Sequence, residues 1–246
     1  MANKRMEKTK EEMKKLKYLM LFTFIISSLI SAQEEDANII FSYPEESEIS
    51  FLKYPEGIYA KAIYKSQAEV INKYPEQLLE SIISATNQEW VNYNTLGGAE
   101  KASQKKQSHF DKIMTMDKDK NYFELAHKLT FDVGGVPTAI IKFFTHFEGT
   151  DVLSGAAVMQ FVDGRWQKTS HPSLSTLSII VMRMKSEVLE GIVLQNSDDP
   201  NIMVIAERVS TEAGLDLSLL EEEFGSWYSP EIDETKIELY KDPRTW

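Results

Sequence analysis

The sequence predicts an α+β domain in which N-terminal helices pack on a curved four-strand antiparallel meander, followed by a C-terminal helical extension. Two observations predict this class. Helix-like segments come first, and a segment of alternating apolar and polar residues with three turn signals follows over 122–169. Runs of one element type followed by runs of the other are typical of an α+β fold. The expected divisions are a signal peptide over 1–32, an exposed acidic lead-in over 33–58, an α+β domain over 59–194 and an acidic C-terminal extension over 195–246.

Composition limits the function classes. The chain has 246 residues, 27 of them basic and 38 acidic, and its first 32 residues hold seven basic and three acidic ones. The remainder therefore carries 27 minus 7 basic and 38 minus 3 acidic residues, a net charge of −15. Such an acidic body repels phosphate backbones, so nucleic acid is not an expected partner, and either cationic ligands or simple solubility explains the charge better. The absence of cysteine excludes disulfides, thiolate nucleophiles and cysteine-bound zinc.

The N-terminus predicts export. Three lysines within 14–17 precede an apolar run over 18–32, which ends at the small residue Ala32. A charged segment, a short apolar segment and a small residue at the cut are typical of a cleavable signal peptide. The run is shorter than the ~18–20 residues that span a bilayer, which favours a cleaved signal. An uncleaved membrane anchor is the alternative. The true start is open between Met1, Met6 and Met13.

Helices are predicted both before and after the meander along the chain. Before it, apolar spacing predicts helices over 59–73 and from Pro75 onward, a capping box at Thr86–Glu89 predicts a third, and 99–116 reads as a surface helix. After it, one apolar stripe predicts a long helix over 173–188. The stripe is expected to pack inside the chain, with a homodimer seam as the alternative. Further expectations are a strand over 202–206, a helix over 216–228 and a strand over 236–240.

The alternating segment predicts one continuous apolar face. A three-residue loop at 134–136 would place Phe131 opposite Ala139 and His127 opposite Phe143, whereas a two-residue loop sends Phe143 to the other face. Burial of a single face favours the three-residue loop. A two-residue loop at Asp163-Gly164 places Phe161 opposite Trp166.

Residues 59–169 resemble the NTF2-like (cystatin-like, α+β cone) superfamily in element order, in the three turns and in the Asp163-Gly164-Arg165-Trp166 ending. The resemblance implies a helix laid across a curved sheet, with an apolar interior. Known enzymes of the superfamily place an Asp/His or Asp/Tyr pair inside the cone. The predicted interior of this chain offers His127 without an aspartate beside it. Because such folds host many functions, the resemblance does not fix one.

The candidate site residues come from this interior. His127 is a titratable group on an apolar strand face, either a general base with a helical partner such as Glu89 or Tyr93, or a core histidine. An apolar ligand pocket, or simply a core, is predicted for the set Phe123, His127, Phe131, Phe143, Phe147, Phe161 and Trp166. The four histidines lack metal-ligand spacing, so no metal and no cofactor are expected.

The sequence thus predicts an exported, non-catalytic binding protein of unknown ligand, located in a periplasm or outside the cell. The first alternative is a small-molecule enzyme of the isomerase or dehydratase type that uses His127. The second is a membrane-tethered protein with an uncleaved N-terminal anchor. Contact with a membrane is expected only through the export segment.

Overall fold

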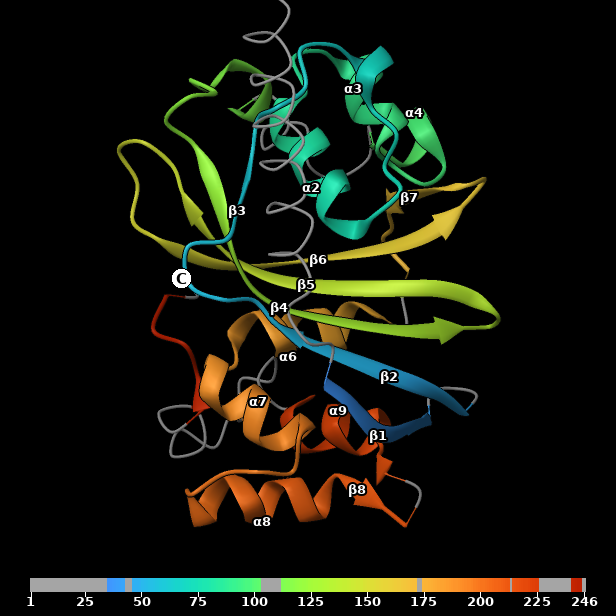
Figure 1. Cartoon of the computed structure of the whole chain (residues 1–246), viewed down its shortest axis with the longest axis vertical. Coiled ribbons are helices and arrows are strands. Elements are labelled where there is room, and N and C mark those ends of the chain that lie inside the picture. The colour runs from blue at the N-terminus through green and yellow to red at the C-terminus, as the bar shows by residue number, and fades with distance from the viewer. Residues whose placement is uncertain are drawn as a thin grey trace, which may run out of the picture. The chain divides into compact units, whose positions relative to one another are not determined.

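A computed structural model of the chain describes residues 35–42, 46–102, 112–171, 174–212, 214–225 and 240–244. Residues Glu35–Trp246 form one compact unit. It is an α+β fold with an antiparallel sheet, which confirms the predicted class (Figure 1). The predicted export segment lies outside the described residues. None of the helices in the described ranges has the length and apolar composition needed to span a bilayer.

Seven strands form the main sheet. Their order is β1-β2-β4-β5-β6-β7, and β3 also pairs with β4. The predicted four-strand meander is β4 to β7, and β2 and β3 extend it beyond β4. The strands are β1 (Glu35–Ser42), β2 (Glu46–Lys53), β3 (Tyr59–Lys61), β4 (Tyr122–Val133), β5 (Val136–His146), β6 (Leu153–Val162) and β7 (Arg165–Lys168).

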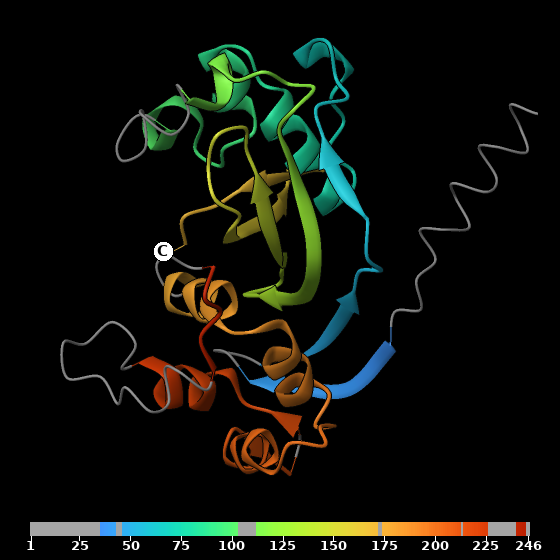
Figure 2. The same cartoon turned by 90° about the vertical axis from the view of Figure 1, so that its left-hand side faces the viewer.

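Helices lie on both faces of this sheet (Figures 1 and 2). One face carries η1 (Gln67–Glu69), α2 (Pro75–Ser84), α3 (Gln88–Tyr93) and α4 (Gly98–Ala102). The other carries α6 (Ser175–Arg183), α7 (Ser186–Val193), α8 (Pro200–Arg208), α9 (Leu217–Gly225) and a small hairpin of β8 (Ser210–Thr211) and β9 (Gly214–Leu215). A sheet covered on both faces buries two sets of alternating side chains, so the expectation of a single buried face is wrong.

The hairpin registers follow from this double burial. Val133 pairs with Val136 across a two-residue Gly134-Gly135 turn, so the three-residue loop is wrong. Both turn glycines have positive φ, 58° and 74°, as such a tight turn requires. Phe131 consequently lies opposite Thr138. In the last hairpin, Phe161 does pair with Trp166, as predicted.

A β-bulge in β4 moves its apolar side chains from one face to the other. Leu125 pairs with Phe143, but His127 pairs with Lys142, which leaves Ala126 as the extra residue. Because one inserted residue reverses the inside–outside alternation, residues before and after the bulge enter different cores. Upstream of the bulge β4 pairs with β3, and downstream it pairs with β2.

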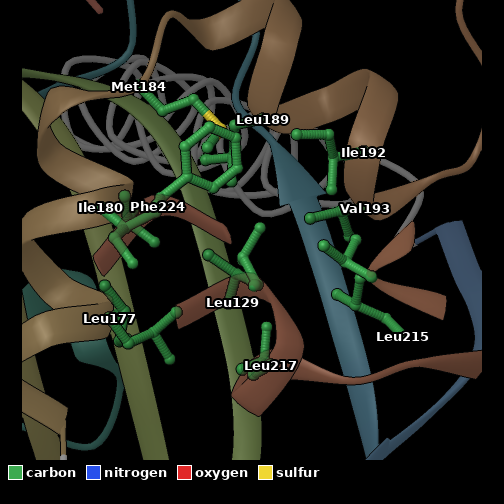
Figure 3. Packing of buried hydrophobic residues seen from close by; sticks show 14 of the residues in the cluster. Leu129, Leu177, Ile180, Met184, Leu189, Ile192, Val193, Leu215, Leu217 and Phe224 are labelled. Carbon is green, nitrogen blue, oxygen red and sulfur yellow. The ribbon is translucent and has the colours of Figure 1, made fainter. Parts of the chain in front are cut away.

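The larger core lies between the sheet and the C-terminal helices (Figure 3). Leu129 from β4 meets Leu177 and Ile180 from α6 there, and Phe224 from α9 is fully buried in the same cluster. The smaller core lies under α2 on the other face, around Leu78 and neighbouring residues of β4, β5 and β6.

Two expectations about the ends of the domain change as a result. Residues of 195–225 contribute Ile205 and Phe224 to the larger core, so this part of the expected extension is integral to the domain. In the expected lead-in, Ile49 and Phe51 of β2 are both 2% exposed, so this part is not an exposed segment. The apolar stripe over 174–188 is buried in the same core and is not open as a dimer seam.

Several predicted elements differ locally. Residues 59–73 form β3 and a short 3-10 helix, because Tyr59–Lys61 pair with β4. Residues 202–206 belong to α8, because Asp199 caps its N-terminus and Pro200 occupies the first turn. The helix expected over 173–188 is divided into α6 and α7 at Met184, whose backbone is extended.

Other predictions are confirmed. Helix α2 begins at Pro75 and α9 lies within the predicted 216–228. The third helix is present, but its N-cap is Asn87, whose side chain accepts a bond from the Trp90 N–H, in place of Thr86. Residues 236–239 of the expected strand and 103–111 of the helix expected over 99–116 lie outside the described residues.

Lys118 caps the C-terminal end of α2. Its Nζ donates to the carbonyls of Ile83 at 2.8 Å and Ala85 at 2.9 Å, and also to that of Ile113. We expect Lys118→Met to lower the free energy of unfolding by roughly 1–3 kcal/mol, because it leaves carbonyls at a helix end without a donor. Chemical denaturation would measure the loss. The matched control is Lys112→Met at an exposed position, and an equal effect there would contradict the capping role.

Candidate functional site

The candidate site is a band of polar and aromatic side chains on one face of β3, β4 and β5. Cross-strand pairing places Tyr59 beside Glu124 and Phe144 in one row, and Lys61 beside Tyr122 and His146 in the next. Beyond the bulge the same face continues with the pair His127 and Lys142. We call His127, Lys142, Asp242 and Arg244 the inner cluster, and Tyr59, Lys61, Tyr122, Glu124 and His146 the outer array.

His127 is sealed in the protein. It is 1% exposed, its ring stacks on Phe51 at 5.3 Å, and neither ring nitrogen has a hydrogen-bond partner. Burial, together with the nearby cations Lys142 and Lys53, lowers the pKa of His127 to about 3. The imidazole is therefore neutral at physiological pH and a weak base. The proposed partners Glu89 and Tyr93 lie on α3, on the opposite side of the sheet (Figure 1).

Lys142 is a fully buried cation. Its Nζ donates to the Met184 carbonyl and lies 3.8 Å from Oδ2 of Asp242. Burial lowers the pKa of Lys142 to about 8, and Asp242 acts in the opposite direction. The side chain thus depends on the carboxylate for compensation of its buried charge.

Asp242 is held by a second cation. Arg244 donates to both carboxylate oxygens of Asp242 at 2.9 Å, and its guanidinium lies 3.8 Å from the ring centroid of Phe144. Burial raises the pKa of Asp242, but the hydrogen bonds from Arg244 and the charges of Lys142 and Arg244 together outweigh that effect and hold the pKa below its usual value. The arrangement is a bidentate charge-assisted pair.

The C-terminal segment Tyr240–Arg244 closes the inner cluster. The amide of Lys185 donates to the Tyr240 carbonyl at 2.8 Å, and the amide of Ser154 donates to the Arg244 carbonyl at 2.7 Å. These bonds attach the segment to α7 and β6. The inner cluster is therefore satisfied by the chain itself, apart from the ring nitrogens of His127.

The outer array reaches solvent, since Tyr59 and Lys61 are exposed and the other three residues are half-buried. Tyr59 is 39% exposed and meets Tyr122 edge-on, with ring centroids 5.0 Å apart and planes at 74°. On the other side of Tyr122, the His146 ring is stacked at 4.7 Å, and its Nε2 lies 2.7 Å from Oε2 of Glu124. Lys61 Nζ lies 5.1 Å from the Tyr59 ring centroid and 5.6 Å from that of Tyr122. This combination of rings, a carboxylate and a cation can bind a charged organic group.

The residues predicted to line one pocket are divided by the sheet. The described structure places five of them in or against the smaller core, where Phe123 lies 4.5 Å from Phe143 and Phe161 lies 5.7 Å from Trp166. Phe147 packs against the same core. Phe131 belongs to the larger core, and the ring of His127 stacks on Phe51 of that core. The set is therefore core packing on two faces.

A second polar cluster faces α2. Glu76 Oε1 accepts a bond from Lys128 at 2.9 Å and one from the Tyr54 hydroxyl. One turn along α2, burial and the charge of Glu76 raise the pKa of Glu80 to about 7. No group of three potential metal-ligating side chains occurs within the described ranges.

Sequence reasoning missed the outer array. Tyr59 and Lys61 lay in a segment expected to be helical, and Tyr122 and Glu124 looked like the ordinary solvent face of a strand. An available signal was the alternation of Tyr59 and Lys61 itself, which suits a strand edge. Comparison with protein-family models, with curated proteins and with solved structures found no match to this chain.

Proposed function

We propose that this chain is an exported, non-catalytic binding protein whose recognition surface is the outer array. One observation carries the proposal. In the inner cluster, His127, Lys142 and Asp242 are buried, and the charges of Lys142, Asp242 and Arg244 are paired within the chain. The adjacent outer array instead has two tyrosine rings, a histidine and a carboxylate that are exposed or half-buried.

The environment of His127 argues against catalysis by this residue. A general base must reach the proton that it removes, and it works best when its pKa lies near the operating pH. His127 is 1% exposed and has a pKa of about 3. Its cross-strand neighbour is the cation Lys142, where an enzyme would need a carboxylate or tyrosine to orient the ring.

A relationship to the NTF2-like superfamily is part of the proposal. It is supported by α2, which packs on one face of the antiparallel strands β4 to β7. The second helical layer, α6 to α9, covers the other face and would be an addition to a cone-type domain.

Export is tested by the N-terminus of the processed protein. When the full chain is expressed in a bacterial host and recovered from the periplasm or medium, we expect Edman sequencing to begin at Gln33. The reason is the charged segment, apolar run and terminal Ala32 of a cleavable signal. Membrane-bound protein with an intact segment before Ala32 would support the tethered alternative and contradict processing.

The recognition surface is tested by NMR shift mapping on the processed protein. A panel of one organic cation, one carboxylate and one neutral alcohol is expected to perturb ring resonances of the outer array with at least one member. A Tyr59→Leu/Tyr122→Leu variant is expected to keep its fold and lose this response. The matched control is Tyr74→Leu, since Tyr74 is 65% exposed and lies outside the array. Perturbations confined to other surfaces would contradict the proposal.

A further inference from the structure

We infer that the corner between Tyr59 and Tyr122 is a binding site for an organic ammonium ion, and that Lys61 occupies it while the site is free of ligand. The inference rests on the proposed role of the outer array in binding. It adds the chemical class of the ligand and the residues that select it.

The corner has the geometry of a partial aromatic cage. The two tyrosine planes stand at 74° to each other with centroids 5.0 Å apart, so they form two walls that meet at an edge. The Lys61 ammonium already lies within about 6 Å of both centroids, at 5.1 and 5.6 Å. That is the distance at which a cation is attracted to the face of an aromatic ring. The position of Lys61 thus marks where a ligand ammonium would lie.

The electrostatics around the corner favour a cation. Tyr59 pairs across the strands with Glu124, which places a carboxylate in the row next to the rings. His146 is bonded to that carboxylate and stacks on the outer side of Tyr122, so it supports the wall and orients Glu124. Over the whole chain beyond residue 32 the net charge is −15 (27 minus 7 basic, 38 minus 3 acidic residues), which raises the local concentration of cations.

Lys61 is suited to leave the corner. Its side chain is exposed, and no hydrogen bond or ion pair joins its Nζ to another described residue. Among the described residues only the two rings hold the ammonium, and exposed contacts of this kind are weak. A ligand ammonium therefore displaces Lys61 into solvent, because the flexible stem lets the lysine ammonium swing out and that ammonium is strongly hydrated. The same lysine lowers the affinity for the ligand, because its charge competes for the corner.

The experiment uses choline chloride as the probe and the processed protein as the target. Its uncharged isostere, 3,3-dimethyl-1-butanol, has the same shape without the charge, and sodium acetate supplies an anion. Ring resonances of Tyr59 and Tyr122 are followed by NMR during each titration. We expect choline to bind roughly tenfold more tightly than the isostere, since two ring faces contribute to attraction of the charge.

Substitutions assign the effect to the corner. Lys61→Met is expected to tighten choline binding several-fold, and Tyr122→Leu is expected to abolish the shifts at Tyr59. Glu124→Gln is expected to weaken binding and to reduce its dependence on salt concentration. The control Tyr74→Leu is expected to leave choline binding unchanged. Circular dichroism of each variant separates loss of the site from loss of the fold.

The outcomes separate the ligand class from the proposed function. Equal binding of choline and its isostere, or a response of the array to acetate alone, would overturn the ammonium site and leave the binding role of the outer array supported. Absence of any shift in the array, with all three probes and also in Lys61→Met, would overturn both. Tighter choline binding by the Lys61→Met variant supports the inference directly.

Discussion

Replacement of Asp242 by asparagine is expected to lower the free energy of unfolding by about 3 kcal/mol at pH 7. The carboxylate lies 3.8 Å from Lys142 Nζ, and both side chains are at most 1% exposed. Removal of the negative charge leaves the buried ammonium without compensation, which is the costly way to break such a pair. Urea unfolding of the two proteins measures the difference.

The opposite substitution is the matched control. Lys142→Met is expected to cost no more than about 1 kcal/mol, because Asp242 keeps its bidentate pair with Arg244 and a buried charge is replaced by an apolar chain. The double variant is expected to recover most of the stability lost by Asp242→Asn, as coupled neighbours do. The coupling would be contradicted if the two single variants lost equal amounts of stability and the double variant lost the sum of both.

The pH adds a second test of the same pair. Burial places the pKa of Lys142 at about 8 in the folded protein, below the 10.5 of an unperturbed lysine. Between these values only the unfolded chain binds the proton, so this group makes the protein more stable as the pH rises from 8 to 10.5. In Asp242→Asn the pKa of Lys142 falls further, so the stability of the variant begins to rise at a lower pH than that of the wild type. The difference between the two free energies of unfolding is therefore expected to shrink between pH 7 and pH 9.

His127→Leu is expected to gain stability relative to the wild type as the pH falls. The pKa of His127 is about 3 in the folded protein against 6.5 in an unperturbed histidine. Below about pH 6.5 the unfolded chain therefore takes up a proton that the folded protein does not, and this favours unfolding. Between pH 7.5 and pH 5 the wild type loses about 2 kcal/mol through this residue, and the leucine variant does not.

Comparison with the wild type at each pH isolates this effect. Glu80 makes the protein more stable as the pH falls, the opposite of the effect of His127. Burial raises the pKa of Glu80 to about 7, so the folded protein takes up this proton before the unfolded chain does. That contribution is the same in both proteins and cancels in the difference. His171→Leu at a partly exposed position is the control. If the difference in free energy of unfolding between His127→Leu and the wild type does not change with pH, His127 is not sealed in its neutral form.

The sequence predicted the parts of the fold that local signals encode. The Asp163-Gly164 turn fixes the pairing of Phe161 with Trp166, and Pro75 marks the first turn of α2. These features depend on a few neighbouring residues, whose backbone preferences are strong. The cap and proline at Asp199-Pro200 are a local signal of the same kind for the start of α8, but the strand expected over 202–206 was wrong because it followed the short apolar run instead.

The bulge at Ala126 was not predictable in the same way. Apart from His127, every second residue from Phe123 to Val133 is apolar, and no glycine or proline marks the extra residue. The bulge follows from tertiary structure, because β4 changes its partner from β3 to β2 there and each half faces a different core. Residues such as Leu129 and Phe143 were therefore assigned to one face, although the sheet separates them.

The candidate site was partly hidden for the same reason. His127 was recognised as the titratable group on an apolar strand face, but its neighbours Lys142 and Asp242 come from a different strand and from the C-terminal segment. A contact between distant parts of the chain has no local sequence signal. Once β3 is identified as a strand, by contrast, Tyr59 and Lys61 fall on one face by simple alternation.

The claim that His127 is sealed inside the protein, while the outer array on the same sheet face reaches solvent, is tested most directly by NMR titration of the His127 ring. Its resonances are assigned by their absence from the spectrum of His127→Leu. The structure predicts that they keep the chemical shifts of a neutral imidazole from pH 8 to pH 5, because the pKa of His127 is about 3. Titration of this ring with a midpoint between pH 6 and pH 7 in the folded protein would contradict the account.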